Sequence, residues 1–127
     1  MSPDLNIFVA WAGILAGVLA GVAQGMFFHR DDWLGGYGSW RRRLMRLGHV
    51  SFFGIAFLNL AFAWTARQAG WRPPCALPAV TLAAAQGLMP LVCYLAAWRP
   101  GMRRLFFLPV SCVVVGAAGL LLGRVAP

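Results

Sequence analysis

Two histidines are the side chains of this sequence best suited to bind a cofactor. His29 directly follows the first long apolar run, and His49 lies just inside the second run. If these runs form neighbouring antiparallel helices, the two imidazoles lie at a similar depth and can share one site. A pair of imidazoles can bind the iron of haem b, and with a carboxylate from Asp31 or Asp32 it can bind a transition metal. The sequence therefore offers His29 and His49 as ligands for haem or a metal, with Asp31 and Asp32 as further metal ligands.

A structural role for both histidines is the alternative interpretation. His29 would pair with Asp31 or Asp32 at the membrane surface, and His49 would form a hydrogen bond to a neighbouring helix. Groups for other chemistry are few, because the sequence has no Gly-x-Ser-x-Gly elbow, no His-Glu-x-x-His motif and no glutamate. The sequence therefore favours a protein that is not an enzyme, unless a cofactor bound at the histidines supplies the chemistry.

The elements that position these residues are four long apolar runs. The chain has 127 residues, of which 61% are hydrophobic and only 11% are charged, and its mean hydropathy is +0.72. A helix needs about 20 apolar residues to cross roughly 30 Å of hydrocarbon. The runs cover residues 6–28, 47–66, 77–98 and 105–123. We predict an all-α integral membrane protein, a four-transmembrane-helix bundle that forms a single domain over residues 1–127.

The arginines indicate an orientation for this bundle. All 11 basic residues are arginines, and most of them lie in the first and third connections between the runs. Those on the first and third connections are Arg30, Arg41, Arg42, Arg43, Arg46, Arg99, Arg103 and Arg104; those on the opposite side are Arg67, Arg72 and Arg124. Short basic loops stay in the cytoplasm. We therefore predict a bacterial, multi-pass protein of the prokaryotic inner (plasma) membrane, with both termini periplasmic or extracellular.

A glycine ladder is the strongest repeated pattern in the sequence. Gly13, Gly17, Gly21 and Gly25 recur at every fourth position of the first run. One helix face then lacks side chains, so another backbone can approach it closely. Packing within the bundle is the favoured interpretation, and docking of a partner subunit is the alternative.

The first connection combines arginines, aromatic residues and glycines in a way that predicts a defined cap. Trp40, Arg41, Arg42 and Arg43 are expected to contact anionic lipid headgroups or a protein partner. The +8 net charge taken alone would suggest a nucleic-acid partner, but the arginines lie between apolar runs. We therefore expect anionic lipid headgroups as their partner and no nucleic acid. Within the runs, Gln24, Asn59 and Gln86 are expected to join helices by hydrogen bonds.

By elimination, the sequence favours a non-catalytic small integral membrane subunit or accessory protein of a larger inner-membrane assembly, such as an energy-transducing complex. Its expected partners are other membrane subunits, or further copies of the chain in a homo-oligomer. The first alternative is a small membrane redox protein that binds haem b or a metal through His29 and His49. A small channel or transporter is the third reading, and the absence of a clear internal repeat in the sequence weakens it.

Overall fold

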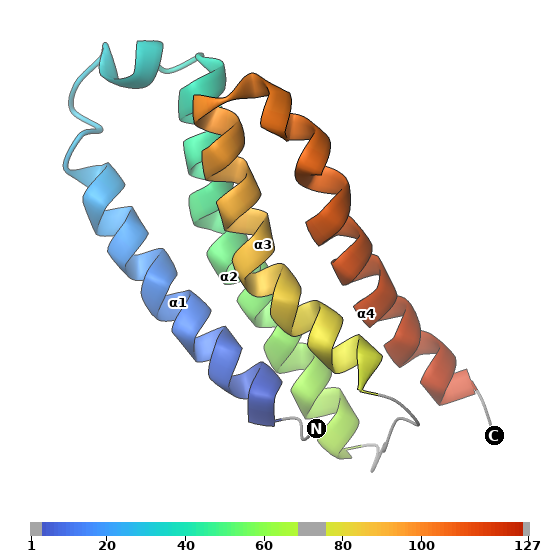
Figure 1. The fold of residues 1–127 in the computed structure, drawn as a ribbon. Helices are drawn as coiled ribbons and strands as arrows, with labels where there is room; N and C mark the ends of the chain where they lie inside the picture. The colour runs from blue at the N-terminus through green and yellow to red at the C-terminus, as the bar shows by residue number, and fades with distance from the viewer. Residues whose placement is uncertain (1–3, 69–75, 126–127) are drawn as a thin grey trace.

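The computed structural model describes residues 4–68 and 76–125, and every regular element in these ranges is a helix. Four long helices run side by side (Figure 1). They are α1 (Asp4–Gly25), α2 (Trp40–Gln68), α3 (Leu77–Trp98) and α4 (Phe107–Val125), with the short 3-10 helices η1 (Trp33–Gly35) and η2 (Pro100–Phe106) in two of the connections. All four long helices, the last together with η2, are long and apolar enough to cross a membrane.

The first two helices have bounds that differ from the expected 6–28 and 47–66. α1 ends at Gly25, and α2 begins at Trp40. The α2 helix starts early because Ser39 caps it: the Ser39 side-chain oxygen accepts a hydrogen bond from the backbone N–H of Arg42 at 3.2 Å. With 29 residues, α2 is about 43 Å long and exceeds the hydrocarbon thickness. Its first turns, which carry the arginines, therefore extend beyond the apolar part of the helix.

Three of the helices form the core of the bundle. α1, α2 and α3 all contact one another, whereas α4 packs mainly on α3 and lies on the far side of the α2–α3 pair from α1 (Figure 1). Small residues occupy the closest approaches; a Cβ atom at Gly48 would lie 2.7 Å from the Tyr94 ring, and one at Gly116 would lie 2.3 Å from Leu82. Close backbone contact of this kind is typical of helices that pack without a hydrophobic driving force.

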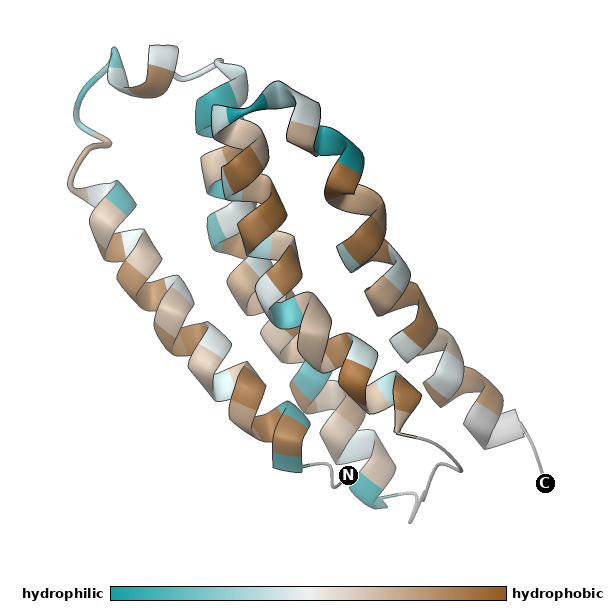
Figure 2. Cartoon of the chain, in the orientation of Figure 1, coloured by the Kyte–Doolittle hydropathy of each residue, from teal (hydrophilic) through white to brown (hydrophobic). Residues whose placement is uncertain are grey.

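Large apolar side chains point outward along the helices. Examples with more than half of their surface exposed are Trp11, Leu15, Val114, Leu121 and Leu122. Figure 2 shows that hydrophilic residues gather at the end of the bundle that carries the two 3-10 helices. An apolar exterior with polar residues at the ends is the distribution that a lipid environment requires.

Candidate functional site

The most elaborate local structure is the segment of residues 26–39, which connects α1 to α2 and which we call the cap. Its chain turns through three residues with positive φ: Leu34 at 55°, Gly35 at 86° and Gly36 at 91°. A positive φ is unusual for leucine, so contacts with other residues must hold it. One such contact is the hydrogen bond that the Ser39 hydroxyl donates to the Leu34 carbonyl at 2.7 Å.

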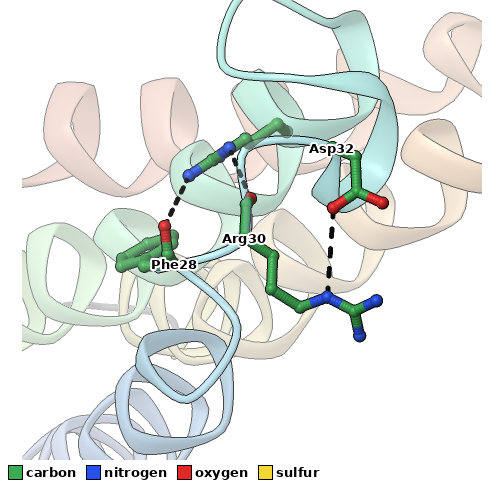
Figure 3. Close-up of polar contacts among 4 residues, drawn as sticks. Phe28, Arg30 and Asp32 are labelled. Atoms are coloured by element: carbon green, nitrogen blue, oxygen red, sulfur yellow. Dashed lines mark hydrogen bonds and ion pairs between the residues drawn. The ribbon is translucent and has the colours of Figure 1, made fainter.

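Arg42 lies at the centre of the cap, although it belongs to α2. Its side chain is only 5% exposed, and its guanidinium group donates hydrogen bonds to the carbonyls of Phe28, at 3.3 Å, and Arg30, at 3.5 Å. Both bonds are drawn as dashed lines in Figure 3. These contacts tie the start of α2 to the chain that leaves α1.

Three aromatic rings surround the same guanidinium group. Its central carbon lies 5.6 Å from the ring centroid of Phe28, 5.5 Å from that of Trp33 and 5.3 Å from that of Tyr37. The rings also contact one another, since Trp33 packs edge-to-face on Phe28 at 5.6 Å. A cation over an aromatic face is stabilised by the ring quadrupole, most strongly where water is excluded. Arg42 therefore acts as an internal brace of the cap.

The structure encloses Arg42 in the cap, whereas the sequence grouped it with Trp40, Arg41 and Arg43 as a contact for lipid or a partner. Helix geometry separates consecutive side chains by about 100°, so Arg42 points into the cap while Arg41 and Arg43 are exposed. Trp40 is 47% exposed and its indole N–H donates to the Ala96 carbonyl of α3 at 3.3 Å. Arg41, Arg43 and part of Trp40 thus remain accessible, and their contact with lipid or a partner stays a prediction.

The first histidine of the predicted cofactor site lies on the surface. His29 is exposed in the turn that follows α1, and Asp31 and Asp32 are exposed beside it. The Asp32 carboxylate lies 3.9 Å from the side chain of Arg30 (Figure 3). Asp32 therefore pairs with an arginine in this structure.

The second histidine lies within the bundle. His49 packs edge-to-face on Phe53, with 5.4 Å between ring centroids. Its ring faces α1, because a Cβ atom at Gly21 would lie 2.7 Å from the Cε1 atom of His49. The Nδ1 atom of His49 is buried and has no hydrogen-bond partner.

The structure does not gather the four proposed ligands into one group. His49 contacts α1 at Gly21, and His29 follows Gly21 by as many residues as make up roughly two helical turns. Within residues 4–68 and 76–125, no three His, Cys, Asp or Glu side chains lie close enough together to hold a metal ion. Binding of haem by the histidine pair stays a prediction that the absorption spectrum of the purified protein tests.

Three of the four ladder glycines face side chains of neighbouring helices. A Cβ atom at Gly13 would lie 2.1 Å from the amide of Gln86, and one at Gly17 would lie 2.9 Å from Phe53. Gly21 faces His49 as described above, whereas Gly25 has nothing within 4 Å of its Cβ position.

Buried amides connect the three core helices. Near the end of the bundle away from the cap, Asn6 donates to Asn59 at 2.7 Å and to the Ala79 carbonyl at 3.0 Å. Asn59 in turn donates to the Leu82 carbonyl of α3 at 3.0 Å. Farther along, the Gln86 amide donates to the Phe52 carbonyl at 2.9 Å. These bonds join α1, α2 and α3 in the way expected for amides inside a membrane bundle.

Sequence reasoning missed two residues of this arrangement. In the sequence, Asn6 marks only the start of an apolar run, and Arg42 is not distinguished from the arginines beside it. The aromatic residues of the cap were the available signal for Arg42, because several rings close to an arginine run favour cation–π contacts.

Comparison with known proteins gives no match: no family model, no curated protein and no solved structure is significantly similar to this chain.

Proposed function

We propose that this chain is a small, non-catalytic integral membrane protein that works as a subunit or accessory protein of a larger inner-membrane assembly, with the cap as its docking surface. The four candidate membrane-crossing helices support the first part of this proposal. The arginines support an orientation with the cap in the cytoplasm, since most of them lie at the end of the bundle that carries the cap and η2.

The observation that carries the proposal is the internal bracing of the cap by Arg42. A flexible tether between two membrane helices needs no fixed shape, because water can form hydrogen bonds with its backbone N–H and C=O groups. Here a buried arginine and three aromatic rings hold the turn, while Tyr37 on its surface is 71% exposed. A surface with a fixed shape loses less conformational entropy when a partner binds.

The charge of this surface indicates the chemistry of the partner. Arg30, Arg41 and Arg43 are exposed around the cap, and Arg46 lies with its guanidinium carbon 4.4 Å from the centre of the Tyr37 ring. Complementary charge favours an acidic protein surface at the membrane boundary. Anionic headgroups can neutralise the arginines that face the bilayer.

Site-specific photo-crosslinking tests this function. A photoreactive phenylalanine analogue in place of Tyr37 should give a discrete protein adduct in native membranes. The matched control places the same analogue at Leu15, which is 61% exposed on an apolar α1 surface and should contact lipid. A second, differently tagged copy of the chain shows whether the adduct is a homo-oligomer. Absence of an adduct at position 37, or equal adducts at both positions, would refute the docking surface.

A further inference from the structure

One layer of the bundle brings together polar side chains from all three core helices. Gln24 on α1 donates a hydrogen bond from its amide nitrogen to the Tyr94 hydroxyl of α3 at 3.3 Å. Tyr94 also lies against Gly48, the residue before His49, and its ring centroid is 6.3 Å from that of Phe52. Gln24, His49 and Tyr94 therefore lie in one layer of the bundle, at heights along the helix axes that differ by about one helical turn or less.

Two atoms of this layer are buried without a hydrogen-bond partner. They are the amide oxygen of Gln24, whose side chain is 5% exposed, and the Nδ1 atom of His49. The Cε1 corner of the imidazole ring faces α1, because Cε1, Nε2 and Nδ1 lie 2.7 Å, 3.3 Å and 3.5 Å from a Cβ position at Gly21. Gln24 follows Gly21 by three residues, so it lies on the same side of α1.

Buried polar atoms in native proteins are nearly always hydrogen-bonded, to protein or to water. The two unpaired atoms come from α1 and α2, and the His49 ring packs against α1 at Gly21, three residues before Gln24. An internal water molecule typically forms about three hydrogen bonds to buried polar groups that lack other partners. Here the acceptors and donors would be the Gln24 oxygen, His49 Nδ1 and the Tyr94 hydroxyl.

We propose that Gln24, His49 and Tyr94 form a buried water-binding site that connects α1, α2 and α3 on the cap side of the bundle. The bound water bridges the Gln24 amide oxygen to His49 Nδ1. It gives this layer the same three-helix connection that Asn6 and Asn59 provide directly at the opposite end. His49 is then a hydrated structural residue and needs no bound metal or haem.

Histidine-selective 15N labelling tests the site, because the chain contains only two histidines. The protein is reconstituted in vesicles of phosphatidylethanolamine and phosphatidylglycerol, and magnetisation transfer from water to the imidazole rings is measured by solid-state NMR. A paramagnetic ion in the bulk water suppresses transfer to surface residues. Transfer to exposed His29 should disappear with the ion present, whereas transfer to His49 should persist.

Two variants define the expected result further. In Gln24→Met, which removes the amide oxygen with little change in length, the transfer to His49 should fall several-fold. Gln86→Met is the matched control, since it also removes a buried amide. Gln86 packs against α1 at Gly13, about two helical turns from Gly21. It should leave the transfer to His49 unchanged.

The proposal is overturned if the wild-type His49 ring receives no magnetisation from water when the ion is present. It is equally overturned if Gln24→Met leaves the transfer intact, or if Nδ1 is bonded directly to a protein group. None of these readouts depends on the cap, so failure here is distinguishable from failure of the docking surface.

Discussion

Leucine in place of Gly17 is expected to destabilise the bundle by about 2 kcal/mol or more, the range found for overpacked cores. A Cβ atom at this position would lie 2.9 Å from the Phe53 ring and 3.0 Å from the Cβ atom of Phe52. The Cβ atom of Phe52 is fixed to its backbone, so the contact cannot be relieved by a rotamer change alone. α1 must then move away from α2.

Thermal unfolding in mild detergent measures this effect. Gly54→Leu is the matched control, because Gly54 also lies inside a long helix but has nothing within 4 Å of its Cβ position. The control should unfold at or above the wild-type temperature, since leucine has the higher helix propensity. Equal unfolding temperatures for Gly17→Leu and Gly54→Leu would show that the ladder does not hold α1 in the bundle.

The second large effect is expected for Arg42→Met, which should release the cap. Methionine fills much of the arginine volume but leaves the carbonyls of Phe28 and Arg30 without their donors. It also removes a cation from three aromatic rings, each contact contributing about 0.5–1 kcal/mol. A loss of about 1.4 kcal/mol raises the population of the open cap tenfold.

Hydrogen exchange of the cap amides measures this release. The N–H groups of Gly35, Gly36 and Ser39 are hydrogen-bonded within the cap, so their exchange should accelerate at least tenfold in Arg42→Met. Arg41→Met is the control, because Arg41 is exposed and contacts the Trp98 ring at 5.7 Å. If the cap amides exchange at the wild-type rate in both variants, Arg42 does not brace the cap. The crosslink at position 37 should then be independent of Arg42.

The helices could be predicted from the sequence because the length of an apolar run is directly visible in it. The start of α2 could not be predicted in this way. The apolar run begins only after Arg46, but the helix already begins at Trp40, because Ser39 caps it there. A helix continues beyond its apolar part wherever its backbone N–H and C=O groups still have hydrogen-bond partners. Hydropathy alone therefore marks the apolar part of a helix rather than its ends.

The site was harder to predict because it depends on the path of the cap. Arg41, Arg42 and Arg43 are identical in type and consecutive in sequence, and which of them is enclosed depends on how the cap folds back over the start of α2. The matched depth expected for the two histidines assumed that the first helix continues to residue 28. Because α1 ends at Gly25, His29 lies in the turn beyond the helix while His49 stays inside the bundle.

Cysteine labelling in intact bacterial cells tests most directly the central claim, a membrane-crossing bundle with the cap in the cytoplasm. Cysteine is placed at Tyr37 in the cap or at Gln68, the exposed last residue of α2, in a chain whose three native cysteines are replaced by serine or alanine. A membrane-impermeant maleimide should label position 68 in intact cells and position 37 only after lysis. Labelling of position 37 but not of position 68 in intact cells would reverse the orientation, and labelling of both would contradict a bundle that crosses the membrane.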